Sequence, residues 1–551
     1  MKLKRLDLVY LIITGLLSFL LLFDLFITSG HSAYMDGRAH LTTIAQFYES
    51  MKQGVWWVRW TDGFANYGMP LPLFAHQTIG YLGGILSFVF GGDIVLVYKL
   101  MFVVGGIISS MLFYLFLRIY FKPLSSFVGT FFFNFAPYRI LNLYIREALP
   151  EFFASVFFPL ILLATYFFVK KKKKWAVPLL VLFFAVIALS HPMMLIVGGI
   201  LFGGYLLFLL VDEKKRVKTV LSYGMVLLWG LMISAYFVLP LKLENKYFYY
   251  GQTTNHLTPG QYLSSVNYLS PKWHYFYERD IVNRGHFVKG GLPETIVLSV
   301  GVLYLISRLA RDKKKFKPEI VDYATLTGVV LVYMTTRYSG FLYENIDLLS
   351  NIQFPWRMLS SYVYVPPIIL AYFVNKLRNP RLVVVGVMIL IAVLRFPQSY
   401  SKNNTLHNID RYYFTTMNLH SVLMNTVWTG ETADYPVHDK KVGIIEGEGV
   451  IKSYNVKNGF REYQIEADTP LRLADYTFYF PGWNVYVDGV STPMEFQDPN
   501  YRGVITYKIP AGNHHVVLKF EETRIRQYSI IISIFASFSF IVWIVMRQRS
   551  K

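Results

Sequence analysis

The run LDLVYLIITGLLSFLLLFDLFI at residues 6–27 is almost entirely apolar and long enough to cross a membrane, since one helical span needs about 20 residues. It is longer than the apolar core of a signal peptide, and it lacks a cleavage site of small residues. We therefore expect an uncleaved first span near residues 6–28. The whole chain has the same character, with 54% hydrophobic and only 16% charged residues, whereas soluble proteins carry about 25% charged residues.

Apolar runs recur along the chain and predict about 12 helical spans in total. The expected spans lie near residues 6–28, 94–117, 123–137, 148–169, 175–190, 193–211, 217–240, 293–310, 319–335, 360–375, 380–397 and 527–546. We therefore predict a polytopic α-helical membrane protein, with a small extracytoplasmic β-rich domain before its last span.

Basic residues decide the expected orientation of these spans. The chain holds 54 Lys and Arg against 34 Asp and Glu, a net charge of +20. The basic residues gather at the ends of spans, which is the positive-inside pattern of membrane proteins and not the pattern of a nucleic-acid-binding surface. The clusters are Lys2–Arg5, Lys170–Lys174, Lys214–Lys218, Arg308–Lys317, Lys376–Arg381 and Arg547–Lys551. We expect a multi-pass protein of the cell (cytoplasmic) membrane with cytoplasmic N- and C-termini and no nucleic-acid partner.

The short, glycine-rich segment QTIGYLGGILSFVFGG at residues 77–92 decides the number of spans. As a full span it would reverse the orientation of every later one and place Lys170–Lys174 outside. We therefore predict a re-entrant or interfacial helix here.

This orientation places most of the polar loop sequence on the outer face, where we expect the protein to act. Within 398–526, the stretches FYFPGWNVYVDG (478–489) and GVITYKIPAGNHHVVLKFEE (503–522) have strand-like residues around turn signals. Asp488-Gly489 is a typical hairpin turn. We predict a membrane domain at 1–397 with outer loops 29–76 and 241–292, a β-rich domain at 398–526, and a final span with a basic tail at 527–551.

The first outer loop contains the first candidate site. Asp36 lies just past the first span, where a carboxylate is costly unless it is solvated or used. His40 is four residues later and shares a face with Asp36 if this stretch is helical. Thr42–Lys52 is typical of an amphipathic helix lying on the membrane. A solvated loop carboxylate is the alternative for Asp36.

Aromatic and polar residues follow in the same loop. Flat rings stack on sugar faces, and arginine binds phosphate through two parallel hydrogen bonds. The loop therefore suits a carbohydrate or lipid-phosphate site, with Arg59, Asn66 and Tyr67 as candidates. Tryptophans and arginines of an ordinary interfacial belt are the alternative explanation, above all for Trp56, Trp57 and Trp60.

A second group of candidates lies at other outer ends of spans. In NLYIREALPEFFA (142–154), Arg146, Glu147 and Glu151 are ionisable at membrane depth, where such residues usually pair or contact a substrate. A structural ion pair at the helix start is the alternative. His191 stands at a break between two spans, and Arg357 follows Trp356 at the mouth of another. A helix boundary and a snorkelling belt arginine explain these two residues equally well.

Several other kinds of chemistry have no support in the sequence. The chain has no cysteine, which excludes disulfides and cysteine-bound metals. It has no phosphate-binding Walker loop, dinucleotide fingerprint, HExxH motif or nucleophile elbow. His514-His515 lies in an expected strand, where adjacent side chains face opposite ways, so we predict no metal site there.

Four stretches resemble a known group of proteins. They are YMDGRAHLTTIAQFYESMKQGVWWVRWTDGFANYGMPL (34–71), IREALPEFF (145–153), QFPWRML (353–359) and FPGWNVYVDG (480–489). A first span followed by an acidic outer loop resembles the GT-C class of membrane glycosyltransferases. More narrowly, the chain is similar to bacterial YfhO-type membrane proteins and to those labelled "6-pyruvoyl-tetrahydropterin synthase-related", a label that names no chemistry visible in this sequence.

The resemblance implies an inverting glycosyltransferase with an outward-facing site. It implies a polyprenyl-phosphate-linked sugar donor and, as acceptor, a cell-envelope polymer or lipid. Asp36 matches the position of the general base, while Arg146 and Arg357, with Arg59 behind them, would stabilise the departing lipid phosphate. Some members of the class hold a divalent metal with acidic first-loop motifs. Asp36 and Asp62 are far apart here, and the loop has no DxD motif, so we expect metal-independent transfer, with a divalent metal as the alternative.

Two other functions fit the sequence less well. A flippase or transporter of a lipid-linked intermediate would favour ionisable residues deep inside the spans, and Asp24 is the main such residue. A non-catalytic envelope scaffold would present the β-rich domain, but it leaves the polar residues of 31–67 and 142–151 unexplained.

Overall fold

The computed structural model describes residues 4–27, 30, 35–63, 67–248, 261–270, 288–311, 316–381, 384–386, 388–389, 425–430, 435–436 and 438–549. The chain divides into two compact units. The first comprises Met1–Gly37, Lys99–Leu231 and Asn255–Leu406, and the second comprises Arg38–Tyr98, Met232–Thr254 and His407–Lys551. The domain boundaries expected at 397 and 526 remain predictions.

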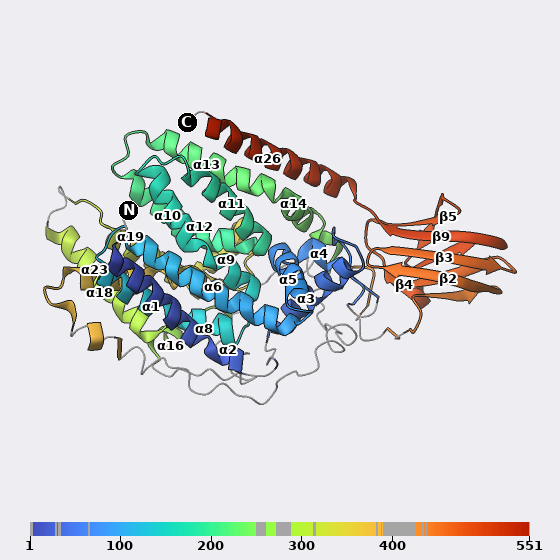
Figure 1. The fold of residues 1–551 in the computed structure, drawn as a ribbon, viewed down its shortest axis with the longest axis horizontal. Helices are drawn as coiled ribbons and strands as arrows, with labels where there is room; N and C mark the ends of the chain where they lie inside the picture. Colours follow the sequence, from blue (N-terminus) through green and yellow to red (C-terminus); the bar gives the residue numbers. More distant parts are fainter. Residues whose placement is uncertain are drawn as a thin grey trace. The chain divides into compact units, whose positions relative to one another are not determined.

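The first unit is helical (Figure 1). Its elements are α1 (Arg5–Leu21), α2 (Phe23–Ile27), most of α6 (Ile94–Leu117), α7 (Pro123–Asn134), α8 (Pro137–Tyr144), α9 (Leu149–Val156), α10 (Phe158–Val169), α11 (Ala176–Ser190), α12 (Met193–Leu210), most of α13 (Arg216–Ile233), α16 (Ser265–Leu269), α18 (Leu292–Arg311), α19 (Ile320–Thr335), η4 (Arg337–Ser339), α20 (Gly340–Asn345), α21 (Asp347–Ser350), η5 (Pro355–Met358), α22 (Leu359–Tyr362) and α23 (Val365–Lys376). Helices α10, α11 and α12 pack on one another, α12 packs on α19, and α23 packs on α7, α18 and α19.

Seven helical segments of the described chain are long and apolar enough to cross a membrane. They are Ile94–Leu117, Leu149–Val169, Met193–Leu210, Arg216–Ile233, Leu292–Arg311, Pro355–Lys376 and Arg524–Arg547. Their positions match spans expected from the sequence, while the total of about 12 remains a prediction. The first apolar run is divided into α1 and α2 at Leu22, and most of the expected span at 380–397 lies outside the described residues.

Several apolar helices of the described chain are shorter than a bilayer is thick. Helix α5 (Gln77–Val89) has 13 residues and α7 has 12, which gives each a length of about 18–20 Å, against a hydrocarbon core of about 30 Å. The length of α5 fits the expected re-entrant or interfacial helix, whose place in the membrane remains a prediction. Helix α7 lies within the span expected at 123–137, and that span remains a prediction.

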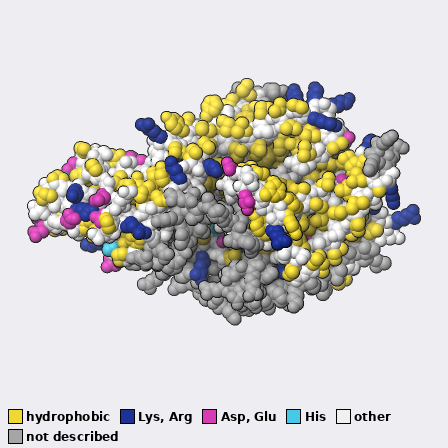
Figure 2. All heavy atoms as spheres, turned by 180° about the vertical axis from the view of Figure 1, so that it is seen from behind, with side chains coloured by type: hydrophobic (Ala, Val, Ile, Leu, Met, Phe, Trp, Pro, Cys, Tyr) yellow, Lys and Arg dark blue, Asp and Glu magenta, His cyan; other side chains and the backbone are white. Residues whose placement is uncertain are grey.

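Exposed apolar side chains cover the outer surfaces of several helices. Leu221, Met225 and Leu228 of α13 are exposed, and so are Ile296 and Leu303 of α18. Figure 2 shows such hydrophobic side chains over much of the visible surface of the helices. A soluble protein rarely exposes contiguous apolar patches of this kind, whereas lipid chains solvate them.

The second unit combines helices with two antiparallel sheets. Its helices are α3 (Gly37–Lys52, entering from the first unit), α4 (Leu71–Phe74), α5, α14 (Ala235–Leu243), η1 (Asn245–Tyr247), η8 (Pro499–Tyr501) and α26 (Arg524–Arg549). Its strands are β1 (Val442–Glu446), β2 (Gly449–Lys457), β3 (Phe460–Ala467), β4 (Leu471–Phe478), β5 (Trp483–Val487), β6 (Val490–Thr492), β7 (Met494–Glu495), β8 (Val504–Ile509) and β9 (Gly512–Phe520). Helix α26 packs along α14.

The strands confirm the predicted β-rich segment. One sheet has the order β1-β4-β8-β7 and the other β2-β3-β9-β5-β6. Figure 1 shows β2, β3, β9 and β5 of the second sheet side by side in this order. Asp488 and Gly489 have φ values of 50° and 81°, which are the left-handed conformations that a two-residue hairpin turn between β5 and β6 requires. The two strands expected in 503–522 form, but β8 and β9 belong to different sheets.

The first outer loop contributes to the core of this unit. Trp60 and Tyr67 are buried in the same cluster as Phe480 and Trp483. The Trp60 ring lies 5.2 Å from that of Trp483 in an edge-to-face arrangement. The aromatic residues of the loop thus include two that pack inside the unit, as well as Trp56 and Trp57, which are exposed.

Helix α3 packs on a glycine face of α5. A Cβ atom added to Gly83 would lie 2.6 Å from Cγ1 of the buried Ile44, so these helices meet only because the glycine has no side chain. By contrast, a Cβ atom at Gly203 of α12 would meet nothing within 4 Å.

We predict that Gly83→Ala lowers the stability of the protein by about 1–3 kcal/mol, the usual cost of overpacking. The matched variant Gly203→Ala should raise it by about 0.5–1 kcal/mol, because alanine loses less backbone entropy in a helix. Thermal unfolding of the two purified variants measures the difference, and equal melting temperatures would contradict the packing described for α3 and α5.

Candidate active site

A break between α8 and α9 creates the candidate site in the first unit. The chain leaves the helical conformation after Tyr144, and Glu147 has a left-handed φ of 52°. Pro150 then stands at the start of α9, where proline fits because its missing N–H would have no helical partner. The break brings Arg146 within 2.8 Å of Glu151, measured from Nη1 to Oε2.

Arg146 is the centre of the polar contacts. Its side chain is 2% exposed, and Nη1 donates hydrogen bonds to Asn142 Oδ1 (2.7 Å), Tyr138 OH (3.1 Å) and Glu151 Oε2. Nη2 lies 3.4 Å from Asp36 Oδ2. Burial alone would lower the pKa of Arg146, but attraction to Glu151, Tyr138 and Asp36 raises it above its usual value. The guanidinium therefore stays charged.

Glu151 accepts hydrogen bonds on both carboxylate oxygens. Tyr138 OH (2.6 Å), Asn142 Nδ2 (3.0 Å) and Ser360 Oγ (2.7 Å) donate to Oε1. Oε2 contacts Arg146 and lies 3.4 Å from Arg357 Nε. The side chain is 1% exposed. This one carboxylate therefore holds α8, α9, η5 and α22 together.

Arg357 is the second buried cation of the site. Nη2 donates to Gln353 Oε1 at 3.1 Å, and Nη1 lies 3.1 Å from Met193 Sδ. Its Nε faces Glu151 at ion-pair distance but without hydrogen-bond geometry, and within the described chain neither this Nε nor that of Arg146 has a hydrogen-bond acceptor. Both arginines thus keep donor capacity.

Asp36 is the exposed member of the cluster. Its side chain is 44% exposed, and its backbone N–H donates to the carbonyl of Arg146 at 3.1 Å. No donor among the described residues bonds Oδ1. Glu147 is buried, and its carboxylate lies so close to Gly37 that a side chain there would collide with it. The segment that carries Asp36 thus sits tightly against the α8–α9 turn.

The structure brings together four of the residues predicted from the sequence: Asp36, Arg146, Glu151 and Arg357. Glu147 is buried beside the segment of Asp36. His191, at the junction of α11 and α12, is buried close enough to Glu151 to interact with its charge.

The other predicted residues belong to the second unit and have contacts there. His40 is buried, with its ring 5.3 Å from that of His76. Arg59 pairs with Glu522 at 2.8 Å and stacks on Trp57. The hydroxyl of Tyr67 donates to the carbonyl of Pro436 at 2.9 Å. Asn66 lies outside the described residues.

Sequence reasoning missed three members of the cluster, Tyr138, Asn142 and Ser360. Tyr138 and Asn142 are four residues apart on one face of α8, and Arg146 follows four residues later, just past the end of that helix. Ser360 follows Arg357 by one helical turn. Helical spacing of polar residues around the predicted arginines was therefore the available signal.

The carboxylates of the site do not fit a divalent metal. Over the described part of the chain, no three His, Asp or Glu side chains form a group that could hold one. Both oxygens of Glu151 already accept from cationic or hydroxyl and amide donors, which a metal would have to displace.

The chain belongs to a family of membrane proteins described as "6-pyruvoyl-tetrahydropterin synthase related domain", whose model matches residues 79–404, more than half of the chain. The match includes Arg146, Glu151, His191 and Arg357 and begins after Asp36. The predicted family and multi-pass membrane character are confirmed. None of the curated proteins matches the sequence.

Two solved structures of glycosyltransferases are similar to this chain at low identity. The arabinofuranosyltransferase AftD from Mycobacteria is 14% identical with a TM-score of 0.42, over 72% of this chain and 26% of that chain. The oligosaccharyltransferase AglB from Archaeoglobus fulgidus, solved with an inhibitory peptide and a dolichol-phosphate, is 14% identical with a TM-score of 0.39, over 71% of this chain and 54% of that one. This chain thus spans about a quarter to a half of their lengths.

We predict that Glu151→Gln destabilises the protein by about 3–5 kcal/mol, because it leaves two buried guanidiniums without their shared counter-charge. Glu344→Gln, which changes an exposed carboxylate of α20, is the matched control and should have little effect. Thermal unfolding of the purified variants measures both. The double variant Glu151→Gln with Arg357→Gln should lose less than the sum of the single variants, since the two residues interact; additive losses would contradict the shared pair.

Proposed function

We propose that this member of the 6-pyruvoyl-tetrahydropterin synthase-related membrane family is a glycosyltransferase. It transfers a sugar from a polyprenyl-phosphate-linked donor to a cell-envelope polymer or lipid at the extracytoplasmic face of the cell membrane. One observation carries the proposal: a half-exposed carboxylate, Asp36, contacts a buried cluster that holds two arginines. That arrangement pairs an accessible base with a cationic wall, as transfer from a lipid phosphate requires.

Asp36 is the general base of this proposal. Of the two carboxylates that contact Arg146, it is the one with solvent access, whereas Glu151 is buried and accepts on both oxygens. Asp36 Oδ1 takes the proton of the acceptor hydroxyl as the hydroxyl oxygen forms a bond to the anomeric carbon. The bond from that carbon to the phosphate oxygen breaks, and its electron pair leaves on the lipid phosphate. Attack opposite the leaving group inverts the anomeric configuration.

Arg146 and Arg357 stabilise the departing phosphate. Negative charge develops on the leaving oxygen, and fixed cations in a water-poor site stabilise such charge far better than solvent does. Each guanidinium has a buried Nε without an acceptor in the described chain. Glu151 is a positioning residue, since it holds both guanidiniums and is itself held by Tyr138, Asn142 and Ser360.

The outer-face location of this chemistry rests on the charge pattern of the sequence. Every basic cluster falls on one side if the N-terminus is cytoplasmic, and Asp36, the α8–α9 turn and η5 then fall on the other.

We predict that Asp36→Asn lowers the transfer rate by about 10²–10⁴-fold, the usual contribution of a general base. The variant keeps the size of the side chain and removes only its basicity. Membranes that contain wild type or variant at equal amounts are supplied with labelled polyprenyl-phosphate sugars, and label in envelope polymer or lipid is measured. Asp347→Asn, which changes an exposed carboxylate of α21 in the same unit, is the control and should transfer at the wild-type rate.

Each outcome decides a different part of the proposal. Transfer by Asp36→Asn at the wild-type rate would remove Asp36 as the base. Absence of transfer by the wild type from every polyprenyl-phosphate sugar would contradict the glycosyltransferase and favour an envelope scaffold.

A further inference from the structure

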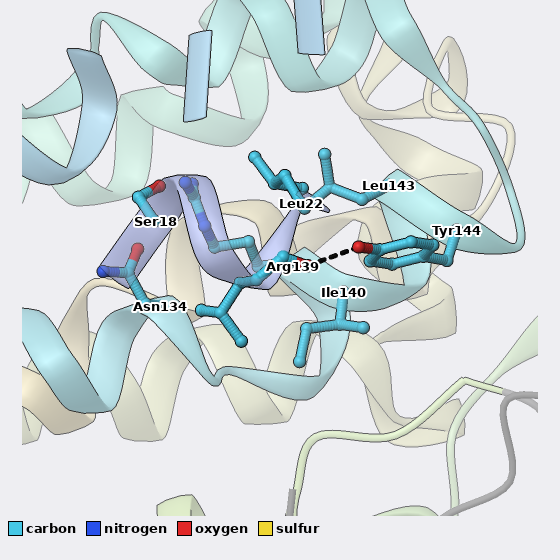
Figure 3. Close-up of a pocket in the computed structure, with 8 residues that line it drawn as sticks. Ser18, Leu22, Asn134, Arg139, Ile140, Leu143 and Tyr144 are labelled. Carbon is cyan, nitrogen blue, oxygen red and sulfur yellow. Dashed lines mark hydrogen bonds between the residues drawn. The ribbon is translucent and has the colours of Figure 1, made fainter. Parts of the chain in front are cut away.

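A groove along α18 in the first unit is large enough to hold a ligand. Its volume is about 850 Å³, within the range of about 300–1,000 Å³ that is usual for ligand pockets. By contrast, the cavity shown in Figure 3, with Leu22, Ile140 and Leu143 in its wall, has a volume of about 10 Å³, which is room for about one water molecule. The groove along α18 is therefore the space that can take a molecule from outside the chain.

Parts of α16, α18, α19, η4 and α22 form the walls of this groove. The hydroxyl of Tyr268 on α16 lies 2.7 Å from that of Thr335, at the end of α19. The carbonyl of Tyr268 lies 3.2 Å from Thr295 Oγ1, in the first turn of α18. The start of α18 and the end of α19 therefore lie at the same end of the groove.

The two ends of the groove differ in chemistry. Thr336 and Arg337 line the end where α19 finishes and α18 begins. Val302 and Leu303 also line the groove, and they follow Thr295 by seven and eight residues, which is about 10–12 Å along the helix. The groove thus has a cation at one end and an apolar wall that extends into a segment long and apolar enough to cross the membrane.

Arg337 has no counter-charge in the described chain. Its side chain is exposed, its guanidinium takes part in no ion pair or hydrogen bond there, and its one side-chain contact of note is with the ring of Tyr338, whose centre lies 5.3 Å away. A guanidinium in this state can bind a phosphate through two parallel hydrogen bonds.

We propose that the groove binds one anionic glycerophospholipid of the surrounding bilayer. Its phosphate contacts Arg337, and one acyl chain lies along Val302 and Leu303. The groove and such a lipid have the same order of features, with charge at the membrane boundary and hydrocarbon beyond it. A free phosphate would leave the apolar wall uncovered, whereas an acyl chain covers it.

This lipid is a different molecule from the sugar donor of the proposed function. Ser360 of α22 donates to Glu151, whereas Tyr362, two residues later, lines the groove. Successive residues of a helix are about 100° apart around its axis, so these two side chains leave α22 on nearly opposite sides. The groove thus lies across α22 from the cluster of Arg146 and Arg357, and its occupant is a lipid of the bilayer.

The test uses the full chain purified in detergent. Native mass spectrometry counts bound lipid during titration with dioleoylphosphatidylglycerol, which has a net negative charge, or dioleoylphosphatidylcholine, which has the same chains and no net charge. We expect one phosphatidylglycerol to bind about fivefold more tightly, the usual contribution of one arginine near an anionic lipid. Arg337→Gln should remove this preference and leave phosphatidylcholine binding unchanged. Arg524→Gln, at an exposed arginine that begins α26, should keep the preference.

A second pair of variants tests the position of the acyl chain. Ser299 lines the groove at an exposed position of α18, so Ser299→Trp fills the groove without overpacking a core. This variant should bind both lipids more weakly than the wild type does. Val300→Trp adds the same ring at an exposed neighbour that does not line the groove, and it should bind both lipids as the wild type does.

Three results would overturn the proposal. Equal affinity of the wild type for the two lipids, or a preference that survives Arg337→Gln, would remove the phosphate from Arg337. Unchanged binding by Ser299→Trp would place the acyl chain elsewhere. Displacement of the bound phosphatidylglycerol by a polyprenyl phosphate would assign the groove to the substrate lipid. Transfer activity enters none of these measurements, so the result is independent of the proposed function.

Discussion

A single buried carboxylate, Glu151, imposes the constraint on which the rest of the site depends. It lies between Arg146 and Arg357, whose positions in the sequence are 211 residues apart, and it also receives hydrogen bonds from α8 and α22. Charges are costly to bury unless they are paired and hydrogen-bonded. The break after α8, the positive φ of Glu147 and the short elements η5 and α22 all serve to bring these partners together, so the irregular backbone of this region is the means of building the cluster.

The same arrangement explains why Asp36 differs from Glu151. Both contact Arg146, yet Glu151 is buried and accepts on both oxygens, while Asp36 is half-exposed and its Oδ1 accepts from no donor among the described residues. A fixed, buried network behind an accessible carboxylate is how enzymes combine precise orientation with reactivity.

The sequence predicted the helices well because the length of an apolar run has a direct physical meaning. The runs at 94–117 and 193–211 became α6 and α12 almost residue for residue, and Asp488-Gly489 formed its turn because both residues tolerate left-handed backbone. A structural ion pair between Arg146 and Glu151 was one of the two explanations that the sequence allowed for these residues, beside contact with a substrate. Contacts between residues far apart in the sequence were not predictable, so the hydrogen bond from Ser360 to Glu151 was missed. The sequence alone does not show whether an aromatic residue lies in the membrane interface, in a sugar-binding site or in a hydrophobic core. The structure was needed to place Trp60 beside Trp483 in a core.

The most direct test of this account is a cryo-EM structure of the full chain with a non-transferable polyprenyl-phosphonate sugar. The account predicts phosphonate oxygens within hydrogen-bond distance of Arg146 or Arg357, with the anomeric carbon facing Asp36. A head group bound elsewhere, with the contact between Asp36 and Arg146 undisturbed, would contradict the central claim that this cluster is the site of transfer.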